Sequence, residues 1–290
     1  MKTNFHTHTQ RCRHAQGCAE DYLRAALDSS LSVLGFSDHA PFPDFDYGYR
    51  MPFSELEEYI AEVAKLKRDY VGKISLYTGL EIEYLPQYES YYEDLKGKYH
   101  MDYLLLGEHF FVDSEQKIFN ITTGAPNTEK YLEYADAVSQ ALKTGFFDAV
   151  AHPDIFTMSP LPWDRNCDAA TDHILEAAAR SGVVLEYNAN GLRRGLKEYP
   201  DGERYMYPHE NFWLRAAKSG LPVVVGSDCH NPTQMWDSCM DAALENLKRY
   251  GITPTPLLKF CKGPPQEVLG LRSAEGGVHR RLLAGQQFLT

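Results

Sequence analysis

Short apolar runs alternate with amphipathic stretches along most of this chain. Seven runs bounded by turn-forming residues have the apolar density of buried parallel strands, whose two faces are both covered. They span residues 3–6, 33–37, 75–82, 103–107, 149–152, 183–187 and 223–227. Helical periodicity lies between them, over residues 55–70, 128–143, 169–181, 211–219 and 234–250. This alternation predicts an α/β fold with mostly parallel strands, either a barrel or a doubly wound sheet.

The longest segments without either pattern are rich in Pro, Gly, Tyr and Asp. They span residues 40–52, 113–127, 156–165 and 190–208, and we expect them to be lids over a site rather than linkers. No repeat or linker divides the chain, so we expect one domain over residues 1–262. The pattern weakens after it, and we expect residues 263–290 to form a tail that is only partly ordered.

Composition narrows the function classes. The formal net charge is -11 and the sequence pI is near 5.5, which argues against binding to nucleic acid or to an anionic membrane surface. The six cysteines form no C-x-x-C pair, so we expect reduced thiols. We find no signal-peptide pattern and no apolar stretch of membrane-spanning length, and we therefore expect a soluble, cytoplasmic protein.

Histidines and acidic residues gather where the expected strands end. His6 and His8 are two positions apart, so on a strand they point to the same side. Later strand ends supply further side chains of the same kinds: His14, His39, Glu81, His109, His152, Asp228 and His230. Because the carboxyl ends of parallel strands meet at one edge, we expect these groups to converge.

A convergent set of imidazoles and carboxylates would be costly to bury without a cation. Nitrogen and oxygen ligands with almost no cysteine suit Zn, Mn or Fe rather than a structural thiolate site. The set is too large for one ion, so we expect two or three divalent metal ions. Bound cations would also explain how an acidic chain could accept an anionic phosphate substrate.

In combination, these motifs resemble the PHP (polymerase and histidinol phosphatase) family. The His6-Thr7-His8 start, the Ser37-Asp38-His39 segment and the closing Ser227-Asp228-Cys229-His230 carry the resemblance. It implies a distorted seven-stranded (β/α)7 barrel with a trinuclear metal site at the C-terminal rim. The implied metal positions are held in turn by His6, His8, Glu81 and Asp228; by Glu81, His109 and His152; and by His14, His39 and His230.

Within that family, the Ser37–Pro41 segment followed by Tyr49–Pro52, and the segments 186–188 and 191–193, resemble the histidinol-phosphate phosphatases. The resemblance favours Glu81 over Glu83 as the metal ligand, because Glu81 directly follows Gly79-Leu80, as the acidic residue of the family motif does. Glu108, directly before His109, departs from the family pattern.

Substrate contacts are expected from arginines in the loops. An Arg can hold a phosphate through two parallel hydrogen bonds. We expect Arg193, which matches the family segment, and Arg50 to do this, and Arg194 to point to solvent.

The resemblance implies hydrolysis of a phosphate monoester, most closely of L-histidinol phosphate in histidine biosynthesis, by a hydroxide bridging the metals. Asp228 or a metal-bound water would deliver the proton to the leaving group, and Asp44 and Asp46 would attract a substrate ammonium. The expected partner is a small phosphorylated metabolite, with no nucleic acid or membrane; the oligomeric state stays open.

The alternatives are a PHP-family phosphoesterase for another small ester or a nucleotide, a non-catalytic PHP accessory domain, and an amidohydrolase-like deaminase. The deaminase is disfavoured because the middle strand carries Glu81 instead of a carboxylated Lys or an additional His.

Overall fold

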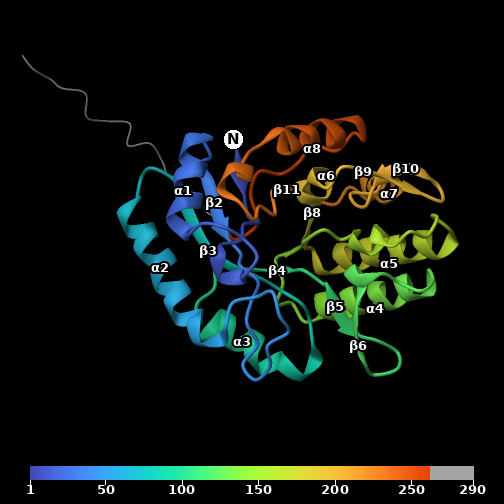
Figure 1. Cartoon of the computed structure of the whole chain (residues 1–290), viewed down its shortest axis with the longest axis horizontal. Helices are drawn as coiled ribbons and strands as arrows, with labels where there is room; N and C mark the ends of the chain where they lie inside the picture. The colour runs from blue at the N-terminus through green and yellow to red at the C-terminus, as the bar shows by residue number, and fades with distance from the viewer. Residues whose placement is uncertain (262–290) are drawn as a thin grey trace, which may run out of the picture.

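Seven parallel strands form a nearly closed barrel in the computed structural model, which describes residues 1–261 (Figure 1). Their order follows the chain: β1 (Thr3–Asn4), β2 (Val33–Phe36), β3 (Ser75–Ile82), β4 (Tyr103–Leu106), β7 (Ala149–Val150), β8 (Val184–Asn188) and β11 (Val223–Gly226). Thr7, after β1, forms a parallel bridge with Cys229, after β11, and this contact brings the two edges of the sheet together. The expected seven-stranded barrel is confirmed.

Helices surround the barrel and cover the outer faces of its strands (Figure 1). They are α1 (Ala19–Asp28), α2 (Leu56–Asp69), α3 (Glu89–Gly97), α4 (Glu129–Lys143), α5 (Arg165–Ser181), the short α6 (Ala189–Arg193), α7 (Glu210–Ser219) and α8 (Ser238–Arg249). Local signals set their ends: the Asp164 side chain accepts hydrogen bonds at the start of α5, and Gly182 ends that helix in the left-handed conformation. Helices α1 and α3 were not predicted from the sequence.

Short elements connect the barrel strands and helices, and some of them lie within the segments expected to be irregular. Two antiparallel hairpins form there, β5 (Phe110–Val112) with β6 (Ile118–Asn120) and β9 (Leu196–Tyr199) with β10 (Gly202–Tyr205). The 3-10 turns are η1 (Gln10–Cys12), η2 (Phe53–Glu55), η3 (Pro86–Tyr88), η4 (Ile121–Thr123), η5 (Ile155–Met158) and η6 (Pro232–Gln234). The expectation of irregular structure is corrected for β6, β9 and β10, whose short strands are partly or fully exposed.

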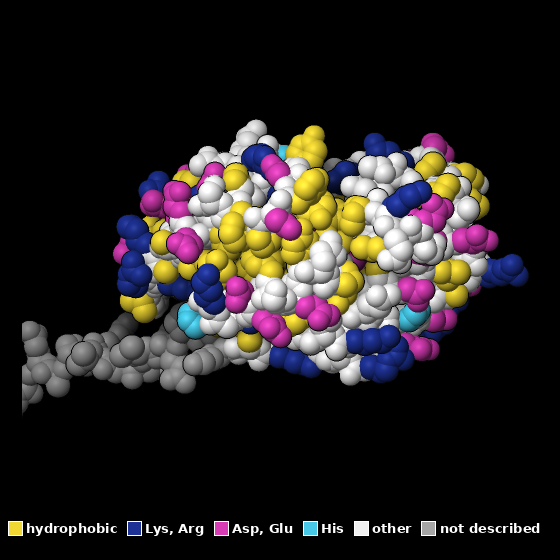
Figure 2. Space-filling view, turned by 90° about the horizontal axis from the view of Figure 1, so that it is seen from below, with side chains coloured by type: hydrophobic (Ala, Val, Ile, Leu, Met, Phe, Trp, Pro, Cys, Tyr) yellow, Lys and Arg dark blue, Asp and Glu magenta, His cyan; other side chains and the backbone are white. Residues whose placement is uncertain are grey.

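No helix among the described residues is long and apolar enough to cross a membrane. The expected tail, residues 263–290, and the domain boundary at 262 lie outside the described residues. Figure 2 shows hydrophobic side chains gathered on the face seen from below, with scattered charges of both signs around them.

The interior of the barrel is closed at the amino ends of its strands by aromatic packing. The Tyr103 hydroxyl donates hydrogen bonds to the carbonyls of Phe5 and Phe36, at 2.8 and 3.0 Å. Gly35 and Gly79 leave room for the Tyr103 ring, because a Cβ at either position would overlap it. Phe260, after α8, stacks on that ring with 5.3 Å between centroids. The carboxyl rim is therefore the open end.

We expect Phe260→Ala to lower the free energy of unfolding by about 2 kcal/mol, because the ring of a partly buried Phe would be lost from the packed interior. Urea unfolding measures this. Phe45→Ala is the matched control, since Phe45 is 59% exposed and its loss should change stability by less than about 0.5 kcal/mol. Equal effects of the two substitutions would contradict the closing role of Phe260.

Candidate metal centre and substrate cavity

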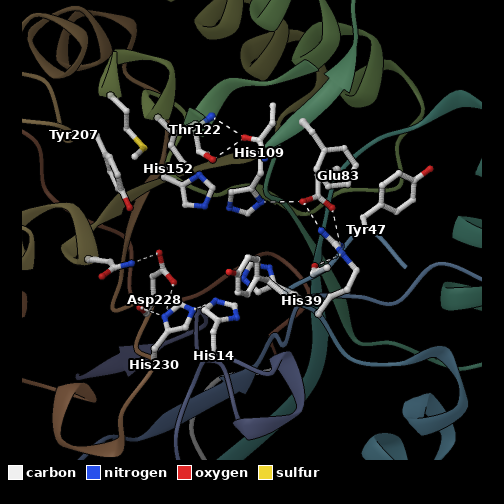
Figure 3. A pocket seen from close by; sticks show the side chains of 18 of the residues that line it. His14, His39, Tyr47, Glu83, His109, Thr122, His152, Tyr207, Asp228 and His230 are labelled. Atoms are coloured by element: carbon white, nitrogen blue, oxygen red, sulfur yellow. Dashed lines mark hydrogen bonds and ion pairs between the residues drawn. The ribbon is translucent and has the colours of Figure 1, made fainter. Parts of the chain in front are cut away.

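A cavity of about 570 Å³ opens at the carboxyl ends of the barrel strands (Figure 3). Six of the expected metal ligands line it: His14, His39, His109, His152, Asp228 and His230. The other three, His6, His8 and Glu81, are buried beside it, with at most 1% of each side chain exposed. The structure thus brings all the expected ligands to one place, although they come from segments as distant as residues 6 and 230.

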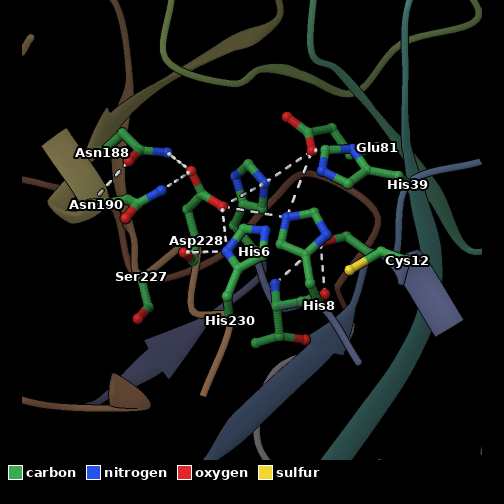
Figure 4. A network of polar contacts seen from close by, with 12 residues as sticks. His6, His8, Cys12, His39, Glu81, Asn188, Asn190, Ser227, Asp228 and His230 are labelled. Carbon is green, nitrogen blue, oxygen red and sulfur yellow. Dashed lines mark hydrogen bonds and ion pairs between the residues drawn. The ribbon is translucent and has the colours of Figure 1, made fainter. Parts of the chain in front are cut away.

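Glu81, at the carboxyl end of β3, contacts five histidines of this cluster, and Figure 4 shows it beside His39. Its Oε1 lies 2.7 Å from His152 Nε2 and 3.6 Å from His109 Nε2. Its Oε2 lies within 3.4 Å of ring nitrogens of three other histidines, His6, His8 and His39. The two oxygens of one carboxylate therefore face two separate groups of imidazoles, which is the geometry of a bridging ligand.

Asp228 and His230 complete the other side of the cluster. Asp228 Oδ1 lies 3.1 Å from His8 Nε2 and 3.5 Å from His230 Nδ1. His230 Nε2 is 2.8 Å from His14 Nε2, and the His8 ring stacks between His230 and His39 with centroid distances of 4.3 and 4.2 Å. Ring nitrogens of His8, His39 and His230 lie within 4.8 Å of one another, close enough to share one ion.

Unpartnered polar atoms show that the cluster fits cations. Buried atoms without a hydrogen-bond partner include His6 Nε2, both His8 ring nitrogens, Glu81 Oε2 and His152 Nδ1. Leaving such atoms unpaired inside a protein is costly, and four of these five belong to the groups around Glu81 Oε2. Nitrogen and carboxylate donors at these positions suit divalent first-row metals.

The protonation states also favour metal binding. Burial opposes the charge of Glu81 and Asp228, yet the surrounding imidazoles hold the pKa of both carboxyls well below the usual range. Burial lowers the pKa of His8 and His39, and that of His230 to about 3. Although burial opposes it, Glu186 raises the pKa of His6 and Glu81 raises that of His109, so a metal ion would displace a proton at these two positions. Ionised carboxylates and neutral imidazoles are the forms that bind metal ions.

Two of the ligands have an unusual backbone. His152 and Asp228 adopt φ angles of 31° and 48°, in the left-handed region that non-glycine residues rarely occupy. Such strained residues persist where the surrounding structure holds them, and they are often found at functional sites. Asp228 is held in this way: its Oδ2 accepts hydrogen bonds from Asn188 and Asn190, at 3.2 and 3.1 Å, while Oδ1 faces the histidines.

Glu186 orients the His6 ring from the side that faces away from Glu81. His6 Nδ1 lies 2.8 and 3.0 Å from the two Glu186 oxygens, and the backbone N–H of His152 donates to the same carboxylate at 3.1 Å. Gly226 permits this approach, because a Cβ there would overlap the Glu186 carboxylate. A carboxylate on one imidazole nitrogen leaves the other nitrogen as the ligand atom. The sequence analysis named Glu186 only as part of a segment that resembles the family, and it predicted no role for this residue.

His109 is oriented in the same way by Glu83, and this changes the expected role of Arg50. His109 Nδ1 lies 2.9 Å from Glu83 Oε1, while Arg50 donates to both Glu83 oxygens at 3.0 and 3.1 Å and to the Ala40 carbonyl at 3.0 Å. Arg50 is only 5% exposed. Although it lines the cavity, its guanidinium is committed to Glu83, so the expectation of a free phosphate-binding Arg50 is corrected.

The neighbouring Arg193 and Arg194 have different surroundings, and Arg193 is not placed as expected. Arg193 donates to the carboxylate of Asp237, to the carbonyl and hydroxyl of Ser227 and to the Gln234 carbonyl, and it does not line the cavity. Arg194 lines the cavity and has no ion-pair partner in the described part of the chain. Arg193 is therefore engaged within the protein instead of being free for a phosphate, whereas Arg194, which was expected to point to solvent, is exposed and lies at the cavity.

Glu108 lies outside the metal cluster. It is fully buried, its Oε2 accepts the backbone N–H of Tyr84 at 2.8 Å, and its Oε1 has no partner. Burial raises the pKa of Glu108 well above the usual range. It does not line the cavity.

A carboxylate between two groups of imidazoles, at the open rim of a parallel barrel, is typical of metal-dependent barrel hydrolases. A model of the PHP domain matches residues 4–190. The chain belongs to the PHP domain family.

Curated relatives and solved structures agree with this assignment. The chain is 32% identical to the "Probable histidinol-phosphatase" of Deinococcus radiodurans, over 83% of this chain and 90% of the relative. It is 26% identical to the histidinol-phosphatase of Bacillus subtilis, over 79% and 94%. The histidinol phosphate phosphatase of Lactococcus lactis, solved with zinc, L-histidinol and phosphate, has a TM-score of 0.67 at 19% identity, covering 87% and 95% of the two chains.

We expect Glu186→Gln to weaken metal binding about 10- to 100-fold, because a neutral amide orients His6 less firmly and makes it a weaker donor. Titration of the metal-free protein against a chelator of known affinity measures this. Glu203→Gln, at an exposed position of β10, is the control. Wild-type affinity in Glu186→Gln would contradict the orienting role.

Proposed function

We propose that this protein is a metal-dependent phosphatase that hydrolyses L-histidinol phosphate to L-histidinol and phosphate. The observation that carries the proposal is the placement of the two Glu81 oxygens between two groups of imidazoles, beside a cavity of small-molecule size. The relatives named histidinol-phosphatase support the choice of substrate, as does the Lactococcus lactis enzyme solved with L-histidinol and phosphate.

The proposed cofactors are two or three divalent ions of Zn, Mn or Fe. Glu81 would bridge an ion held with His6, His8 and Asp228 to one held with two further histidines, His109 and His152. His14, His39 and His230 would hold a third. When bound, the ions supply hydroxide at neutral pH and withdraw charge from the phosphoryl oxygens. Zinc in the Lactococcus lactis structure supports a metal of this kind.

Arg194 is the proposed phosphate contact. It extends along the cavity wall near Tyr207, with 5.9 Å from its guanidinium carbon to the ring centroid. Because no carboxylate neutralises it within the described residues, its charge is available to a phosphate dianion, which planar guanidinium groups bind through paired hydrogen bonds.

Aromatic side chains form the part of the wall that suits the leaving group. Tyr47 and Phe110 line the cavity, and their rings stack with 4.9 Å between centroids. A planar imidazole can pack against such a wall. Asp44 and Asp46 do not line the cavity: Asp44 accepts from the Tyr88 hydroxyl and Asp46 pairs with Arg13, so the expected attraction of a substrate ammonium has no support in their placement.

The rival functions lack comparable support. A nucleic-acid substrate would call for a basic groove, whereas the chain has a net charge of -11 and Figure 2 shows basic side chains scattered among acidic ones on that face. A non-catalytic domain would not need to keep every expected ligand converged on one cavity. The six cysteines are unpaired, which supports action in a reducing compartment, and we propose the cytoplasm.

A phosphate-release screen over metabolite monoesters, with metal-loaded protein, tests the proposed function. We expect L-histidinol phosphate to be the best substrate. His152→Ala should lower turnover by about three orders of magnitude in a folded chain, because Glu81 Oε1 loses its nearest histidine. His173→Ala, on α5, is the control. Full activity of His152→Ala with unaltered metal content, or no release from L-histidinol phosphate, would refute the proposal.

The adjacent arginines provide a matched pair of variants. We expect Arg194→Gln to raise the KM for the phosphate ester about 10- to 100-fold with little change in melting temperature, because a charge-assisted contact to phosphate is lost. Arg193→Gln should instead lower the melting temperature, because it leaves the Asp237 carboxylate without its partner. Steady-state kinetics and thermal unfolding of both variants measure this, and the reverse pattern would contradict the assignment.

A further inference from the structure

Tyr207 reaches the substrate cavity from the loop between β10 and α7, and no motif pointed to it. Its side chain is 2% exposed and lines the cavity. Figure 3 shows its hydroxyl directed into the cavity, on the same side as Asp228. A tyrosine placed in this way can contact a substrate as well as pack against the wall.

The surrounding structure holds the Tyr207 ring in one position. Gly191, at the start of α6, allows the close approach, because a Cβ there would lie 2.6 Å from ring atom Cδ2 of Tyr207. The ring meets His152 edge-on, with 6.1 Å between centroids, and Arg194 lies over it. A rigid ring between a proposed metal ligand and the proposed phosphate contact is well placed for a reacting group.

The hydroxyl proton of Tyr207 is free for a ligand, although the hydroxyl oxygen faces the Arg194 guanidinium and can accept from it. Other buried tyrosines donate to backbone carbonyls, as Tyr59 does to Gly79 and Tyr103 does to Phe5. Among the described residues, Tyr207 donates to no protein acceptor. Burial and then the Asp228 carboxylate raise its pKa, whereas Arg194 lowers it, so both charged groups lie close to the hydroxyl.

The proposed reaction requires a donor at this place. As the P–O bond of an alkyl phosphate breaks, negative charge develops on an alkoxide oxygen, and a positioned donor stabilises it. Asp228, as an ionised ligand, can only accept hydrogen bonds. Two neighbouring polar groups of the wall are engaged: Thr122 donates to Asn120 at 2.6 Å, and Asn190 donates to Asp228. A phenol has an ordinary pKa of about 10 and so keeps its proton at neutral pH.

We propose that Tyr207 is a catalytic residue whose hydroxyl donates a hydrogen bond to the ester oxygen of the leaving group, while Arg194 beside it holds the phosphoryl oxygens. This inference rests on the proposed function, because it assigns a role in phosphate-ester cleavage. It also explains why the cavity wall combines the neutral hydroxyl of Tyr207 with the guanidinium of Arg194, which has no carboxylate partner among the described residues.

Tyr207→Phe, which removes only the hydroxyl, tests this when two kinds of substrate are compared. An alkyl phosphate such as L-histidinol phosphate has a poor leaving group, whereas the nitrophenolate of p-nitrophenyl phosphate needs little stabilisation. We expect kcat/KM of the variant to fall about 100-fold on the alkyl phosphate and less than about threefold on p-nitrophenyl phosphate. Tyr134→Phe, in the core with an unpartnered hydroxyl and outside the cavity, should leave both values unchanged.

An equal loss on both substrates, or no loss on either, would overturn the proposal for Tyr207. Metal content and melting temperature of each variant show whether the centre and the fold stay intact. The wild-type turnover of L-histidinol phosphate tests the proposed function separately. If the wild type does not hydrolyse L-histidinol phosphate, the comparison uses another alkyl phosphate that the wild type does hydrolyse.

Discussion

The structure is organised around a buried carboxylate that needs positive charge. Glu81 is 1% exposed, and Asp228, another acid, lies in the same cluster of imidazoles. Burying ionised carboxylates costs several kcal/mol per group unless positive charge lies beside them. Metal ions between Glu81 and its histidines would remove this penalty and occupy the unpartnered ring nitrogens. The architecture and the proposed chemistry both follow from this requirement.

The barrel meets the requirement through parallel strands whose carboxyl ends converge, and through glycines where side chains must approach closely. Gly226 makes room for the Glu186 carboxylate behind His6, and Gly107 makes room for Glu81 itself. The aromatic packing at the opposite end leaves one open rim. Substrate access, metal ligands and the donors of the cavity wall therefore meet at the same place, which is common in α/β barrels.

Residues at strand ends could be predicted from the sequence, because strand periodicity and parallel topology determine where they point; His6, His8 and Glu81 are examples. Residues on loops and short helices could not. Arg193 and Arg194 are adjacent, and their roles depend on Asp237, which lies far along the chain. Tyr207 depends on its contact with Gly191. The hairpins β5–β6 and β9–β10 were missed because their strands are only three or four residues long, and all but β5 are partly or fully exposed and carry little apolar signal.

Anomalous diffraction from crystals of the metal-loaded protein, collected on both sides of the metal absorption edge, examines the bridging arrangement most directly. We expect at least two peaks, one on each side of the Glu81 carboxylate, with His6 and His8 near the first and His109 and His152 near the second. An anomalous map without a peak beside Glu81, from protein that carries metal elsewhere, would contradict the bridging role and the phosphatase mechanism built on it.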